Sequence, residues 1–142
     1  MAIILDGTNG ITGMPTIMEN ATASATAATG TVNYDVLTQT VLYYTTNASG
    51  TWVLNVRGNS STTLNSVLGV GQSLSIVFMN TNGATAYYPT SLTIDGSAVT
   101  PKWQGGVAPT FGNPNGVDMY SYAIVKTGSA TYSVFASQSR FA

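Results

Sequence analysis

The chain has 142 residues, enough for one domain with an additional arm, and 44% of them are apolar, so a domain-sized core can be buried. Only 6% of the residues are charged and the net charge is −1, which excludes the clustered positive surface that nucleic-acid binding requires. The sequence contains neither Cys nor His. Disulfide bonds, zinc fingers, thiolate nucleophiles and imidazole bases are therefore excluded as well.

The first 30 residues differ in composition from the rest. Residues 6–10 (DGTNG) are typical of a turn, and residues 19–30 (ENATASATAATG) consist mainly of Ala and Thr, which bury little apolar area. We therefore predict an extended N-terminal arm over residues 1–30, with a plain flexible terminus as the alternative. The larger apolar side chains that would anchor this arm in a partner are Ile3, Ile4, Leu5, Ile11, Met14, Ile17 and Met18.

Residues 31–142 carry the pattern of β-strands and are expected to fold without the arm. Residues 32–46 form a run rich in β-branched and aromatic residues. Residues 46–50 (TNASG) predict a hairpin-like turn to the next strand, over residues 51–57. That strand has apolar residues at alternate positions, which places them on one face: Trp52, Leu54 and Val56.

The middle of this region contains one helical signal and further short strands. Residues 62–70 can hold a single helical turn, because glycines end the pattern. Residues 73–79 alternate again, which predicts an inward face of Leu74, Ile76 and Phe78. Shorter strands are predicted over residues 85–88 and 91–95.

The last predicted pair of strands covers residues 117–126 and 130–137, joined by a hairpin at residues 127–129 (TGS). Seven or eight short strands separated by turns are typical of a β-sandwich. We therefore predict an all-β fold: an antiparallel, jelly-roll-like β-sandwich over residues 31–142 with an extended N-terminal arm.

The ionisable residues are too dispersed to indicate a catalytic or metal site. The five carboxylates stand singly in the sequence: Asp6, Glu19, Asp35, Asp95 and Asp118. A glycan-active enzyme would need two carboxylates about 5–10 Å apart, and calcium would need a cluster of them. We predict that the protein is not an enzyme and needs no metal or cofactor. No apolar run approaches the ~20 residues of a membrane span.

Aromatic residues are the most distinctive side chains available for recognition. Tyr and Trp combine apolar area with a polar tip and are common at wet interfaces and against sugars. Tyr87, Tyr88 and Trp103 are our candidates for surface or interface aromatics. Trp103 lies in a loop over residues 99–116 that contains three prolines, and we expect it to anchor that loop.

Several stretches of the chain are similar to a known family. They are VLYYTTNA at 41–48, NVRGN at 55–59, NGATAYYP at 82–89 and VTPKWQGG at 99–106, with a weaker match at LDGTNGIT, residues 5–12. Over residues 31–142 the chain resembles a β-rich domain of virion structural proteins and tail-fibre proteins of tailed phages, notably cyanophages. No catalytic residues come with this resemblance.

The resemblance implies a non-enzymatic virion protein, made in the host cytoplasm and displayed on the particle exterior. A small β-domain with an arm suits a capsid decoration or cement protein, whose partners would be the major capsid protein or another virion protein. The alternative is a tail-fibre or receptor-binding module that binds a host-surface glycan. Self-association as a homotrimer is also expected, because phage β-domains of this size often trimerise. A nucleic acid or a membrane is not an expected partner.

Overall fold

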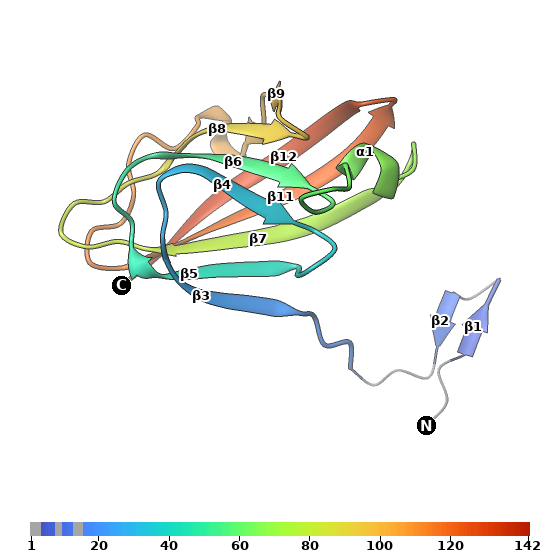
Figure 1. Cartoon of the computed structure of the whole chain (residues 1–142), viewed down its shortest axis with the longest axis horizontal. Coiled ribbons are helices and arrows are strands. Elements are labelled where there is room, and N and C mark those ends of the chain that lie inside the picture. The colour runs from blue at the N-terminus through green and yellow to red at the C-terminus, as the bar shows by residue number, and fades with distance from the viewer. Residues whose placement is uncertain (1–3, 8–9, 13–15) are drawn as a thin grey trace.

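The computed structural model describes residues 4–7, 10–12 and 16–142, and it is built mainly of β-strands (Figure 1). A two-stranded sheet pairs β1 (Ile4–Asp6) with β2 (Gly10–Thr12). The other strands are β3 (Ala21–Ala27), β4 (Gly30–Asp35), β5 (Val41–Asn47), β6 (Trp52–Arg57), β7 (Ser73–Thr81), β8 (Pro89–Ile94), β9 (Ser97–Val99), β10 (Lys102–Trp103), β11 (Val117–Gly128) and β12 (Thr131–Phe141). They form a six-stranded sheet, in the order β10-β12-β11-β7-β5-β3, and a four-stranded sheet, in the order β4-β6-β8-β9. The prediction of an all-β fold is confirmed.

The two larger sheets form two layers (Figure 1). Trp52 of β6, in the four-stranded sheet, packs edge to face against Phe78 of β7 and Tyr120 of β11, in the six-stranded sheet, with ring centroids 5.8 and 5.9 Å apart. All three side chains are buried. Aromatic side chains bury large areas, so this cluster is a major source of the apolar burial that holds the layers together.

The alternating patterns predicted the inward faces of two strands correctly. In β6, Trp52, Leu54 and Val56 are buried, while the residues between them are partly exposed. In β7, Ile76 and Phe78 are buried on the inner face. This agreement follows from the two-residue period of a strand, which separates inner from outer side chains regardless of pairing.

The order in which the chain visits the sheets differs from the prediction. From β3 to β8 successive strands alternate between the two sheets, and neighbours within each sheet are parallel: β3 with β5, β5 with β7, β4 with β6, and β6 with β8. A chain that crosses to the opposite sheet and returns runs in the same direction as the strand two places earlier. Both sheets are therefore mixed, the antiparallel pairing predicted for these strands is wrong, and a jelly-roll order is not confirmed.

The same winding corrects three local predictions. The run over residues 32–46 divides into β4 and β5, which lie in different sheets. Residues 48–51 connect β5 to β6 across the layers instead of forming a hairpin, and the backbone N–H of Ser49 donates to the Ala28 carbonyl at 3.0 Å. Residues 85–88 are not a strand, because the backbone N–H of Tyr87 donates to the Asn82 side chain at 3.2 Å rather than to a neighbouring strand.

The C-terminal hairpin and the single helical turn are confirmed. β11 and β12 pair antiparallel from Val117↔Phe141 to Gly128↔Thr131. The helical turn is α1 (Leu64–Val67), and the Asp95 carboxylate accepts hydrogen bonds from its first backbone N–H groups, those of Leu64 and Asn65, at 2.7 and 3.0 Å. The N-cap residue is Thr63, whose hydroxyl accepts from the backbone N–H of Ser66 at 3.2 Å, so a local residue and a residue from a distant turn together satisfy the first N–H groups of the helix.

The predicted boundary between arm and domain, at residue 30, is wrong. Residues 21–27 form β3, which pairs with β5 at the end of the six-stranded sheet. Ala28 is completely buried and belongs to the core. Ala and Thr bury little area, but an edge strand is held chiefly by its backbone hydrogen bonds, so its composition gave no apolar signal. The two-layer domain therefore includes residues 21–30. No helix within the described ranges is long and apolar enough to cross a membrane.

Candidate functional site

A cavity of about 530 Å³ is lined by residues of both larger sheets and of the loop that follows β10. Strands β8 and β9 bound one side of the cavity, and β10 with the following loop bounds the other. Its volume lies within the range of about 300–1,000 Å³ that is usual for small-molecule sites. The main apolar lining residues are Leu92, Val99, Pro101, Trp103, Pro109 and Tyr122.

The aromatic floor of the cavity is positioned by strand register. Tyr122 of β11 lies opposite Ala136 of β12, and Ala136 lies opposite Trp103 of β10. Trp103 and Tyr122 are thus on either side of Ala136 in the register, and their rings meet edge to face with centroids 5.9 Å apart. Trp103 is half-buried and Tyr122 is buried, so one ring remains accessible while the other supports it. Trp103 anchors its loop, as the sequence predicted.

The backbone that follows Trp103 turns sharply. Gly105 and Gly106 have φ angles of 78° and 80°, in the region that favours glycine, and they form the short 3-10 helix η1 (Gln104–Gly106). The turn carries the loop back over the cavity, where Gly106, Ala108 and Pro109 contribute to the lining. The two glycines therefore shape the wall opposite β8.

The polar lining of the cavity consists mainly of uncharged hydroxyl residues. Thr90, Ser91 and Thr100 are exposed hydroxyl residues of the lining. Lys102 also contributes, but its ammonium group lies over the Phe135 ring, 5.4 Å from the centroid. Phe135 is exposed on the outer face of β12, whereas its neighbour Ala136 is buried on the inner face. The positive charge therefore lies outside the cavity.

A second polar cluster lies at the end of the sheets where β7 and β11 meet the loops. The Asp118 carboxylate is fully buried and accepts hydrogen bonds from the Asn82 side chain at 2.8 Å and from the backbone N–H of Asn113 at 2.9 Å. Burial raises the pKa of Asp118, and these two hydrogen bonds and the charge of Arg140 oppose the shift. Because each donor belongs to a different loop, the cluster pins both loops to the sheet.

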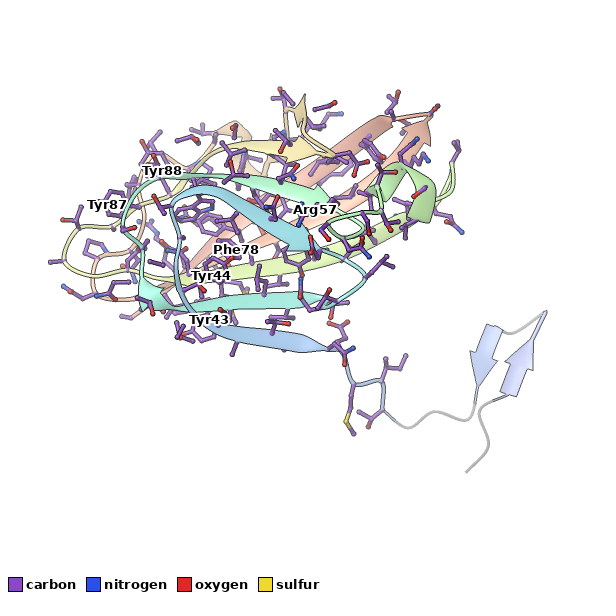
Figure 2. The ribbon with its side chains drawn as sticks, viewed as in Figure 1. Tyr43, Tyr44, Arg57, Phe78, Tyr87 and Tyr88 are labelled. Atoms are coloured by element: carbon purple, nitrogen blue, oxygen red, sulfur yellow. The ribbon has the colours of Figure 1, made fainter. Side chains whose placement is uncertain are left out.

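The predicted aromatics do not form one surface. Tyr87 and Tyr88 lie in the loop between β7 and β8, half-buried, and Tyr87 packs against the core (Figure 2). Tyr44 of β5 packs edge to face against Phe78 at 5.3 Å and has a structural role (Figure 2). Trp103 alone among the three candidates lines the large cavity. The contribution of Tyr122 and Leu92 was not predicted, because Tyr122 meets Trp103 through the pairing of β11, β12 and β10, and Leu92 lines the cavity from the other sheet.

The predicted arm anchors are described only in part. Ile17 and Met18 are 71% and 90% exposed. Ile3 and Met14 lie outside the described residues, and for Ile4, Leu5 and Ile11 only the backbone is described. Within the ranges that the structure describes, no three carboxylate residues group as metal ligands. The anchoring role of these residues stays a prediction.

Comparison with known proteins returned no relative: no protein-family model, no curated protein and no solved structure matches the chain. The resemblance to phage virion domains therefore stays a prediction.

Proposed function

We propose that the chain is a non-enzymatic structural subunit of a phage virion, displayed on the particle exterior as a capsid decoration or cement protein. The observation that supports an attachment role is the segment before β3. Ile17 and Met18 expose most of their side-chain area on this segment, which continues directly into an edge strand. Exposed apolar side chains beside an unpaired strand edge provide both anchors and backbone partners for another protein.

The edge of β3 supports the same proposal. Among the described residues β3 pairs only with β5, so its other edge is unpaired. Its sequence, ATASATA, contains no charged residue and no proline, the residues by which edge strands usually avoid pairing. A strand of the major capsid protein or of another virion protein could therefore add to this edge.

A variant pair tests the attachment role. Ile17→Asp combined with Met18→Asp is expected to abolish binding to phage particles stripped of the protein, because both apolar anchors are lost. Val70→Asp is the control, since Val70 is also an exposed apolar residue, at 63%, but lies far along the chain in the loop after α1. Equal binding of the double variant and the wild type would contradict attachment through this segment.

Quantitative mass spectrometry of purified particles tests the location. Capsid stoichiometry is expected for a decoration protein, whereas tail stoichiometry would contradict this location. We also propose a homotrimer, which suits the low net charge of −1 and the resemblance to phage domains. Light scattering on the purified protein is expected to give the trimer mass, and a monomer at high micromolar concentration would contradict an obligate trimer.

The second candidate function is a tail-fibre or receptor-binding module that takes a host-surface glycan. The cavity beside Trp103 favours it, because an accessible aromatic ring and nearby hydroxyl groups suit sugar recognition. Particle stoichiometry distinguishes the two locations.

A further inference from the structure

We propose that the cavity beside Trp103 binds a neutral saccharide, with one pyranose ring packed on the Trp103 side chain, which the buried Tyr122 ring supports. The proposal deepens the second candidate function and rests on it for the biological source of the sugar. It does not depend on the capsid location or on attachment through Ile17 and Met18. Saccharide binding by the purified protein can therefore fail while particle attachment succeeds, and the reverse.

The apolar part of the cavity suits one face of a sugar ring. A pyranose presents C–H groups on its faces and hydroxyl groups around its edge. Trp103 is half-buried and its ring is supported from the side by Tyr122 at 5.9 Å, so an aromatic surface is already in place before a ligand arrives. A preformed site loses less conformational entropy on binding than one that must be ordered.

The polar part of the cavity suits the ring's edge. Thr90, Ser91 and Thr100 bring hydroxyl groups to the wall, and each can both donate and accept a hydrogen bond. A sugar hydroxyl can also both donate and accept, so either the side chain or the sugar can be the donor of each hydrogen bond.

The distribution of charge around the cavity disfavours anionic ligands such as phosphates and carboxylates. The one cation of the lining, Lys102, directs its ammonium group over Phe135 on the outer face of the sheet, 5.4 Å from the ring centroid. A phosphate or a carboxylate in the cavity would therefore be desolvated without a counter-charge, which is costly. An uncharged ligand carries no such cost.

The size and opening of the cavity indicate a terminal sugar. A volume of about 530 Å³ accommodates a small ligand, and Thr90, Ser91, Thr100 and Gly106 are exposed at its border. A longer glycan could insert one end and leave the remainder in solvent.

The two tryptophans make a direct NMR test feasible. Trp52 is buried in the core, 1% exposed, whereas Trp103 lines the cavity. The full chain, labelled with ¹⁵N, is titrated with a panel of neutral sugars: the methyl glycosides of glucose, galactose, mannose and N-acetylglucosamine, then maltose and lactose. We expect at least one sugar to shift the Trp103 indole N–H signal and leave that of Trp52 unmoved. Trp103→Phe assigns the signals.

Variants locate the binding. Trp103→Ala is expected to weaken binding by about tenfold through loss of the ring contact. Thr100→Val removes one rim hydroxyl at nearly constant volume, so it tests the site without depending on a variant that disturbs the loop. Thr110→Val is the control, because Thr110 is exposed in the same loop but outside the lining. We expect weakening in Thr100→Val and wild-type binding in Thr110→Val.

Three outcomes would overturn the proposal. The first is that no sugar of the panel shifts the Trp103 signal at millimolar concentration. The second is that binding is unchanged in both Trp103→Ala and Thr100→Val. The third is that a synthetic peptide of residues 10–20 shifts the Trp103 signal while the sugars do not, which would assign the cavity to the N-terminal segment of another copy of the chain.

Discussion

Truncation of the N-terminus at two positions should have two different effects on stability. Deletion of residues 1–18 leaves Glu19, Asn20 and β3 in place. Deletion of residues 1–30 also removes β3 and the buried Ala28. The sequence pattern places both cuts within or at the end of an arm, whereas the sheet pairing places only the first before the domain.

The expected loss follows from the hydrogen bonds that the longer deletion removes. The Asn20 carbonyl accepts from the backbone N–H groups of Thr40 and Val41 at 3.0 and 3.3 Å, and the Ala28 carbonyl accepts from that of Ser49 at 3.0 Å. The β3–β5 ladder, which runs from Ala21↔Val41 to Ala27↔Thr46, is lost as well. At about 1 kcal/mol net for each hydrogen bond, the free energy of unfolding should fall by about 3–6 kcal/mol. That is a large part of the total of a small domain, about 5–15 kcal/mol.

Urea unfolding followed by tryptophan fluorescence measures the difference. The chain that lacks residues 1–18 should keep the wild-type midpoint within a few tenths of a molar unit, because it loses only the small β1–β2 sheet and keeps every strand of the six-stranded and four-stranded sheets. The chain that lacks residues 1–30 should unfold at a much lower urea concentration or fail to fold. Equal midpoints for both truncations would refute the assignment of β3 to the folded unit.

Three further outcomes are expected. Lys126→Met should lower the free energy of unfolding by about 2–3 kcal/mol, because the Lys126 ammonium group donates to the carbonyls of Asn65 and Leu68 at 2.6 and 2.7 Å. The control is Lys102→Met, which removes an ammonium group at the surface and should have little effect in the same urea titration. Burial raises the pKa of Asp118, so the folded state binds a proton at this carboxylate more readily than the unfolded state does. The wild type should therefore gain stability relative to Asp118→Asn as the pH falls from 7 toward 3.8, the pKa of the unfolded state. An unchanged stability difference between pH 7 and pH 4 in thermal unfolding would contradict this. Addition of EDTA should leave the melting temperature unchanged, and a fall of more than a few degrees would reveal a metal site.

The candidate site was predictable only at one residue. Trp103 stood out because a tryptophan in a long loop with three prolines is expected to pack against the domain. Tyr122 comes beside Trp103 through the pairing of β11, β12 and β10, and Leu92 lines the same cavity from β8 of the other sheet, so both contributions come from strands that are distant in the sequence. The cavity is lined by residues from both larger sheets and from the loop after β10, and a local sequence pattern does not show which of these segments come together.

The sequence by itself determined the positions of several strands and the buried faces of β6 and β7. The alternation in β6 and β7 and the turn between β11 and β12 are local properties, set by the two-residue period of a strand and by the residues that a turn requires. Only the tertiary structure decided which strands pair. Backbone hydrogen bonds are the same for every residue type, so an Ala- and Thr-rich segment such as β3 pairs as well as an apolar one when the adjacent edge is open. The alternation of strands between the two sheets, and hence their parallel pairing, was decided in the same way by packing across the core.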